Sequence, residues 1–387
     1  MLSIAHTAGT PLPGARNTFS NLDCAAFPDH FCSMFSGGDP GFCIIHAADL
    51  HLGARRFTQG MPKNLGLREK LFHADRLAFS ALLDLCISER ARFLLCSGDV
   101  IDGWCRDASA GLFLATELLR LREVGCETLI LLGNHDIRSR AMRSLLLPCQ
   151  ASLIGVQGPE TRNNEQLGFS VHGWSLPSVA PGDDVVSHYP EPISGHLNVG
   201  LLHTSAEGCR GHIDYAPCSR LSLRRKGYDY WALGHVHTRE VVATNPWIVF
   251  PGNLQGRGFR EPGGKGATRV EVQNGNVVSA EHRAISAVQF ENLIVDDPSI
   301  SSFEHIVEAV RLAGMRAALR AGRCPLVVRV VVSGVESSAA LLRVPSKRRR
   351  VALEWALGDL PQESVFLDEL WMEPGSFSGP IRLDVAA

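Results

Sequence analysis

Short apolar segments alternate with longer amphipathic ones along the first third of the chain. Runs with the length and β-branched content of buried strands occupy residues 42–48, 92–96 and 128–132. Between these runs, apolar side chains recur every three or four positions, as in Ala78, Leu82 and Leu85, which predicts helices over residues 67–90 and 111–123. This alternation predicts a mainly parallel β-sheet covered by helices, an α/β fold.

Further strands are predicted later in the chain, at residues 197–202, 230–233 and 247–250. Residues 268–283 alternate apolar and polar around Asn274-Gly275, a strong signal for a two-residue hairpin turn. Beyond residue 283 the pattern restarts, with helices over 303–321 and 337–342 on either side of a very apolar strand over 326–332. We therefore expect one domain over residues 42–283 and a smaller α+β domain over residues 284–387.

The first 41 residues show no sustained periodicity and end in Gly37-Gly38-Asp39-Pro40-Gly41. Glycine and proline at this density interrupt regular structure. We expect residues 1–41 to form a poorly ordered extension.

Charge and composition narrow the class of protein. The chain has 387 residues, and its 38 Lys and Arg against 40 Asp and Glu give a net charge of −2, so any site for a polyanion is a local patch. With 45% apolar and 20% charged residues, the chain can form a globular core. No apolar run approaches the roughly 18 residues that a membrane span needs.

Cysteine usage indicates the compartment. The 11 cysteines are an odd number and form no Cys-x-x-Cys pair, so we expect reduced thiols and not a disulfide framework. The first 16 residues lack the basic start and apolar core of a signal peptide. A cytoplasmic protein is the simplest interpretation.

Residues capable of chemistry follow directly after the predicted strands. They are Asp49-Leu50-His51, Gly98-Asp99-Val100-Ile101-Asp102, Gly133-Asn134-His135-Asp136, His203 and Gly234-His235-Val236-His237. In open α/β sheets the carboxyl ends of the strands form the ligand crevice. A single Asp or His after a strand usually caps a turn, but five such motifs in one chain indicate a shared site.

Carboxylate, imidazole and amide oxygen without thiolate is a ligand set for Mn²⁺, Fe or Zn²⁺. Six or seven such ligands are too many for one tetrahedral ion. A two-metal site, with the ions roughly 3.5–4 Å apart and bridged by one carboxylate, uses them all.

The order of these motifs resembles that of the calcineurin-like metallophosphoesterases, and the chain is similar to their SbcD/YhaO branch of DNA repair exonucleases. The narrower likeness lies in Ile45-His46-Ala47-Ala48-Asp49-Leu50-His51-Leu52-Gly53, Arg68-Glu69-Lys70, Pro251-Gly252-Asn253-Leu254-Gln255-Gly256-Arg257 and Gly264-Lys265-Gly266. The resemblance covers residues 42–283 strongly and residues 284–387 only in general layout. It implies a sandwich of β-sheets flanked by helices, with a C-terminal capping or DNA-binding domain.

The resemblance also implies a role for each residue. One metal ion is expected on Asp49, His51, Asp99 and His237; the other is expected on Asn134, His203 and His235, with Asp99 as the bridge. His135 would protonate the leaving oxygen, and Asp102 would hold the other nitrogen of its ring. A hydroxide bridging two ions, most simply Mn²⁺, would attack the phosphorus.

A glycine-rich segment after the strand at 247–250 carries Arg257, Arg260 and Lys265. Glycines there would let a phosphate backbone approach, so these side chains are candidate DNA contacts; a mobile surface loop is the alternative. The basic run Lys347 to Arg350 is either a solvated face or part of a DNA path.

The expected function is therefore a metal-dependent DNA exonuclease that acts on DNA ends. A phosphomonoesterase or cyclic-nucleotide phosphodiesterase on the same metal core is the alternative, because one fold serves both. By resemblance, an SbcC-like or YhaN-like coiled-coil ATPase is a candidate partner, and a homodimer through the helices of the metal domain is expected.

Overall fold

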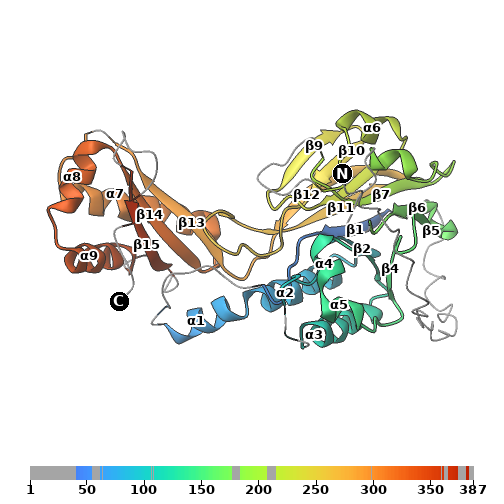
Figure 1. Cartoon of the computed structure of the whole chain (residues 1–387), viewed down its shortest axis with the longest axis horizontal. Helices are drawn as coiled ribbons and strands as arrows, with labels where there is room; N and C mark the ends of the chain where they lie inside the picture. The colour runs from blue at the N-terminus through green and yellow to red at the C-terminus, as the bar shows by residue number, and fades with distance from the viewer. Residues whose placement is uncertain are drawn as a thin grey trace, which may run out of the picture. The chain divides into compact units, whose positions relative to one another are not determined.

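The computed structural model describes residues 41–382, except for 55–61, 63, 106, 108, 177–183, 207–214, 298, 359, 361–364 and 374–380. The extension predicted over residues 1–41 lies outside the described residues, apart from Gly41. Within the described residues the strands form three sheets (Figure 1).

The first sheet has the strand order β12-β11-β1-β2-β3-β4. Its four strands β1 to β4 run parallel, and β11 and β12 add to the β1 edge as an antiparallel hairpin. The bounds are β1 Phe42–Ala47, β2 Phe93–Ser97, β3 Glu127–Leu131, β4 Ala151–Leu153, β11 Gly266–Gln273 and β12 Asn276–Ala284. The predicted parallel arrangement of the first three strands is confirmed.

The second sheet has the order β5-β6-β7-β8-β10-β9. Its inner strands β6, β7, β8 and β10 are parallel, while β5 and β9 are antiparallel edge strands. The bounds are β5 Glu160–Asn164, β6 Phe169–Gly173, β7 Leu197–His203, β8 Tyr230–Gly234, β9 Glu240–Thr244 and β10 Trp247–Phe250.

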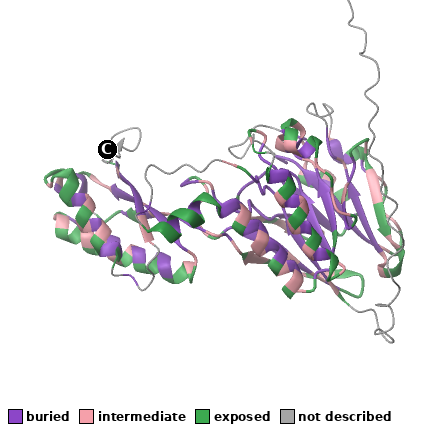
Figure 2. Ribbon diagram, turned by 90° about the horizontal axis from the view of Figure 1, so that it is seen from below, coloured by how far each residue is buried: buried purple, intermediate pink, exposed green. Residues whose placement is uncertain are grey.

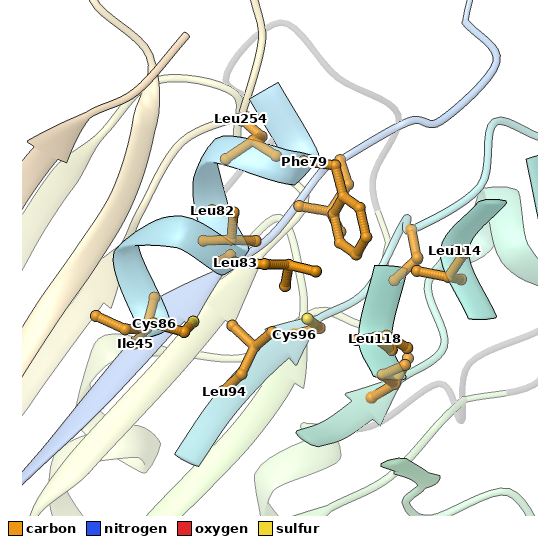
Figure 3. Close-up of a cluster of buried hydrophobic side chains, with 14 of the residues drawn as sticks. Ile45, Phe79, Leu82, Leu83, Cys86, Leu94, Cys96, Leu114, Leu118 and Leu254 are labelled. Atoms are coloured by element: carbon orange, nitrogen blue, oxygen red, sulfur yellow. The ribbon is translucent and has the colours of Figure 1, made fainter. Parts of the chain in front are cut away.

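The two sheets pack face to face. Successive residues of β1 therefore contribute to two different hydrophobic clusters, one between the sheets and one under the helices. Ile44 of β1 joins a cluster with Phe169 and Val199 of the second sheet. Its neighbour Ile45 belongs to the cluster on the other face, where it lies beside Cys86 of α2 (Figure 3). Figure 2 shows these strands as almost entirely buried. Burial on both faces explains why their sequences are continuous apolar runs and do not alternate apolar and polar residues. The predicted sandwich flanked by helices is confirmed.

Helices cover the outer face of the first sheet. They are α2 Ala74–Ser88, α3 Ser109–Leu118, the 3₁₀-helix η2 Leu119–Arg122 and α5 Arg140–Arg143. The helix α1 Leu65–Phe72 precedes α2 and packs in another cluster, through Leu71 against Phe259, and α4 Asn134–Arg138 begins in the segment after β3. The single helix predicted over 67–90 is wrong in one respect: it is two helices that meet at His73, whose φ of −105° and ψ of 17° are not helical. The second sheet is accompanied by η3 Glu165–Leu167, η4 Val185–His188 and α6 Arg220–Arg225.

The predicted hairpin at Asn274-Gly275 joins β11 to β12. Both turn residues have positive φ, 51° and 69°, as a two-residue turn of this type requires. Asn and Gly tolerate that region better than other residues. This prediction is confirmed.

The third sheet has the order β13-β14-β15-β16 and a core of its own, which includes Val328 and Val330. Its elements are β13 Gln289–Val295, α7 Phe303–Ala321, β14 Leu326–Ser333, α8 Val335–Leu342, α9 Ser346–Gly358, β15 Val365–Glu373 and β16 Ile381–Arg382. The helix α9, which begins in the basic run, was not predicted. Among the described residues, no helix is long and apolar enough to cross a membrane.

Candidate metal centre

Backbone hydrogen bonds bring the strand-end motifs together. The strand β1 ends at Ala47, so Asp49 and His51 lie in the loop beyond it. Asp49 N donates to Gly98 O at 3.0 Å and His51 N donates to Asp99 O at 2.9 Å, which joins the loops after β1 and β2. His235 N, after β8, donates to Asp49 Oδ2 at 3.0 Å and so connects the second sheet to the first.

Four of the candidate ligands have a strained backbone. The φ angles are 52° at Asp49, 45° at His51, 55° at Asp99 and 94° at His235. Residues with a side chain rarely adopt positive φ, and each such residue costs on the order of 1–3 kcal/mol. Strain concentrated in this way is typical of functional sites.

The glycines of the motifs allow a close approach of backbone to ligands. A Cβ on Gly133 would lie 2.2 Å from Asp99 Oδ1, and one on Gly98 would lie 2.5 Å from His203 Nδ1. A Cβ on Gly234 would lie 2.0 Å from the carbonyl oxygen of Ser97. The Gly-Asp, Gly-Asn-His and Gly-His-x-His motifs therefore need glycine for steric reasons.

The first ligand cluster contains Asp49, His51 and His237, all buried. The Nε2 atoms of His51 and His237 are 3.1 Å apart, and His237 Nε2 lies 3.6 Å from Asp49 Oδ1. Burial raises the pKa of Asp49 and lowers the pKa of both imidazoles.

The second cluster contains Asp99, His203 and His235, again all buried. His203 Nε2 lies 3.2 Å from Asn134 Oδ1, 3.3 Å from His235 Nδ1 and 3.4 Å from Asp99 Oδ2. The same Oδ2 is 3.9 Å from His51 Nε2 of the first cluster. Asp99 therefore faces both clusters, as a bridging carboxylate would.

The donor atoms fit divalent cations. His203 Nδ1 donates to the Ser97 carbonyl at 2.8 Å, so in the neutral ring Nε2 carries a lone pair toward three other electron-rich groups. A divalent cation held among these atoms would make that arrangement favourable. Although burial lowers the pKa of His203, Asp99 and Asp49 outweigh it and raise the value to about 9, so a proton can take the cation's place. Imidazole with carboxylate suits Mn²⁺, Fe or Zn²⁺.

His135 lies beside these clusters with its side chain 25% exposed. Its Nδ1 accepts a hydrogen bond from Gly103 N at 3.1 Å. Asp102 Oδ2 lies 3.5 Å from Nδ1 of both His135 and His51, so this carboxylate faces two imidazoles, where the sequence led us to expect one. Burial lowers the pKa of His135, but Asp102 and Asp99 outweigh it and the net direction is upward.

Asp136 holds together two of the loops that carry the candidate ligands. Its buried carboxylate accepts hydrogen bonds from Ile101 N at 2.8 Å, Gly133 N at 2.9 Å and Val100 N at 3.1 Å. These bonds tie the loop after β2 to the loop after β3. Asp136 is a structural residue of the centre.

The three basic residues of the glycine-rich segment lie in different surroundings. Arg260 is exposed. Arg257 is half-buried and pairs with Glu261 at 2.8 Å. Lys265 is buried, and its Nζ donates to the carbonyl oxygen of His237 at 3.1 Å.

The basic run at the start of α9 is also divided. Arg349 is buried and donates to Leu341 O at 3.3 Å, while Arg350 pairs with Glu354 at 2.8 Å. Lys347 and Arg348 are exposed.

Sequence reasoning missed Glu261, whose Oε1 lies 2.7 Å from His237 Nδ1. No motif contains this residue. It lies four positions after Arg257 in a segment that shows no helical pattern, and only the folded loop returns it to the metal centre.

Comparison with known proteins agrees with this geometry. The model of the calcineurin-like phosphoesterase family matches residues 43–239. An uncharacterized metallophosphoesterase, YhaO of Bacillus subtilis, is 30% identical over 352 residues, which are 88% of this chain and 81% of that protein. The DNA double-strand break repair proteins Mre11 of Sulfurisphaera tokodaii and Saccharolobus solfataricus are 28% and 29% identical, over 59% and 51% of this chain and 59% and 49% of their own length. The chain belongs to the calcineurin-like phosphoesterase family.

Proposed function

We propose that the protein is a dinuclear metal-dependent phosphodiester hydrolase and that its substrate is DNA, cleaved as by a repair exonuclease acting on ends. The observation that carries the hydrolase assignment is one carboxylate, Asp99, placed between two buried ligand clusters, with the partly exposed His135 at their edge. The relatives named as double-strand break repair proteins support DNA as the substrate.

The roles follow from the positions of the side chains. Asp49, His51, Asp99 and His237 would hold one ion, and Asn134, His203 and His235 would share Asp99 to hold the other. Such ions lower the pKa of water and neutralise charge on phosphoryl oxygens. His135 is exposed enough to reach a substrate, and we assign it the transfer of a proton to the leaving oxygen. Asp102 stabilises the charged form of that ring.

Mn²⁺ is the proposed ion, since the ligands are imidazole, carboxylate and amide oxygen. We propose a cytoplasmic location, in keeping with an odd number of cysteines, 11, and no Cys-x-x-Cys pair in the sequence. A homodimer through α2 and α3 is supported by the exposed side chains of Leu77 and Leu112. A coiled-coil ATPase of the SbcC or YhaN kind is the proposed partner. This proposal rests only on the resemblance of the metal domain to the SbcD/YhaO branch.

Hydrolysis of end-labelled duplex DNA and of bis(4-nitrophenyl) phosphate, each with Mn²⁺ and with EDTA, tests this proposal. We expect Mn²⁺-dependent loss of the DNA label, abolished in a His203→Ala variant that controls for contaminating nucleases. Cleavage of the small ester with untouched DNA would overturn DNA as the substrate. A phosphomonoester and a cyclic nucleotide, assayed in parallel, would then identify the alternative function.

A further inference from the structure

The segment that follows β10 returns to the metal centre through a carboxylate. Glu261 Oε1 lies 2.7 Å from Nδ1 of His237, and the Glu261 side chain is only 13% exposed. Nε2 of the same imidazole faces the first ligand cluster, 3.1 Å from His51 Nε2. Arg257 Nη2 also lies near this Nδ1, at 3.0 Å, but a guanidinium cannot accept a hydrogen bond, so Nδ1–H can donate only to the shorter contact, the Glu261 carboxylate. That bond leaves Nε2 unprotonated, which is the tautomer that a metal ligand needs.

The carboxylate of Glu261 is itself fixed by two neighbours. Arg257 donates to it from its backbone N at 2.8 Å and from Nη2 at 2.8 Å. Asn253 Nδ2 donates to Oε2 at 2.9 Å. With the charge of Arg257 beside it, the carboxylate stays ionised in a nearly dry position.

The same segment also holds the backbone of His237. Lys265 Nζ donates to the His237 carbonyl at 3.1 Å, and Asn253 N donates to that oxygen at 3.3 Å. Leu254 N reaches the carbonyl of Asp49, another ligand of the first cluster, at 3.4 Å. Both the ring and the main chain of His237 are therefore fixed by residues 253–265.

We propose that Glu261 is a positioning residue of the metal centre: clasped by Arg257 and Asn253, it sets the tautomer and the ring orientation of His237. In this proposal the basic residues Arg257 and Lys265 help to position His237, a ligand of the first metal ion: Arg257 binds Glu261, and Lys265 binds the His237 carbonyl. This inference rests on the proposed role of His237 as a ligand and does not depend on which phosphoester is the substrate.

Metal binding to the Glu261→Gln variant tests the proposal without any assay of activity. Gln keeps an acceptor for Nδ1–H but loses the charge and the pairing with Arg257. Glu281→Gln is the matched control, because Glu281 is an exposed carboxylate on β12 that pairs only with Arg283 among the contacts of the described residues. Loss of such an outer carboxylate typically weakens metal binding about 10- to 100-fold.

In calorimetric titrations of metal-free protein with Mn²⁺, we expect this loss at one class of site for Glu261→Gln and no change for Glu281→Gln. With Co²⁺ as the probe, the visible absorption bands should shift for Glu261→Gln, because the ring of one ligand is turned. Thermal melting of the metal-free variants controls for folding. Wild-type Mn²⁺ affinity together with a wild-type Co²⁺ spectrum in Glu261→Gln would overturn the proposal.

The Arg257→Gln variant tests whether Arg257 acts on the metal centre by holding the carboxylate of Glu261. If Arg257 acts through Glu261, the Mn²⁺ affinity should fall, and the Arg257→Gln/Glu261→Gln double variant should lose less than the two single losses combined, because the two residues form one network. Unchanged Mn²⁺ affinity with a raised KM for DNA would make Arg257 a substrate contact and overturn the clasp. Failure of DNA cleavage by the wild-type protein would refute the proposed substrate but leave these binding results intact.

Discussion

The Nε2 atoms of His51 and His237 lie 3.1 Å apart, although one residue follows a strand of the first sheet and the other a strand of the second. Two imidazole nitrogens that both present lone pairs repel each other unless a proton or a metal ion lies between them. This repulsion and the positive φ at His51 both cost free energy of folding. Binding of a cation at the common edge of the two sheets would offset that cost.

Replacing His135 by asparagine separates binding of the metal from turnover. His135 belongs to neither of the two clusters that share Asp99, so we expect His135→Asn to bind Mn²⁺ as the unmodified protein does. Loss of the general acid should lower kcat by about 10²- to 10⁴-fold. Calorimetry with Mn²⁺ and hydrolysis of a phosphodiester, run on the same preparation, check both parts. Loss of Mn²⁺ binding would instead make His135 a ligand.

The glycine before Asn134 is predicted to be indispensable. In Gly133→Ala the new methyl group would meet Asp99 Oδ1 at 2.2 Å and displace the carboxylate that faces both clusters. We expect loss of Mn²⁺ binding in a protein whose circular dichroism is retained. Gly358→Ala is the control, since nothing lies within 4 Å of its added methyl group. Normal Mn²⁺ binding by Gly133→Ala would show that Asp99 does not need its observed position.

Replacing Asp136 by asparagine should destabilise the fold. An amide offers one acceptor oxygen where three backbone N–H groups now donate to a buried carboxylate. A buried N–H left without an acceptor costs about 1–3 kcal/mol. Urea unfolding should therefore give a free energy of unfolding lower by that amount, while the exposed Asp296→Asn changes it by less than about 0.5 kcal/mol. Equal stabilities of the two variants would contradict the structural role of Asp136.

Stability should fall in mild acid because of His46. The ring is buried in β1 with Tyr230 and Leu233 as partners, and burial lowers its pKa to about 3. An unfolded histidine titrates near 6.5, so between about pH 3 and 6.5 the unfolded chain takes up a proton that the folded chain refuses. Folding stability contributed by His46 is thus present above pH 6.5 and is lost as the pH falls, by about 1.4 kcal/mol per unit.

The His46→Gln variant isolates this effect from the other titrating groups. Urea unfolding at pH 6.5 and 5.5 should show a larger loss of stability for the unmodified protein than for His46→Gln. The same pH dependence in both proteins would show that His46 is not the group responsible.

The sequence predicted the candidate ligands because simple rules place them. Apolar runs mark the strands, parallel strands end at one edge, and a polar residue directly after each run, as in Asp49, Asp99 and His203, must lie at that edge. The hairpin at Asn274-Gly275 was predictable for a similar reason, since its turn depends on two residues alone. Short-range rules suffice where the chemistry is adjacent to a strand.

Other features could not be predicted because they depend on contacts between distant segments. Glu261 reaches His237 only through the path of the loop after β10. The positive φ of Asp49 accompanies backbone hydrogen bonds that join its loop to Gly98 and Leu254, which lie far away in the sequence. The helix break at His73 and the burial of Arg349 in α9 also follow from packing, and neither leaves a periodic signal in the sequence.

The number of Mn²⁺ ions bound per chain tests the central claim most directly. Calorimetric titration of metal-free protein, with elemental analysis after dialysis, should give two ions per chain for the unmodified protein. In Asp99→Ala, which lacks the carboxylate that faces both clusters, binding at both positions should weaken together. A single ion, or two ions bound with unchanged affinity by Asp99→Ala, would contradict a dinuclear centre bridged by this residue.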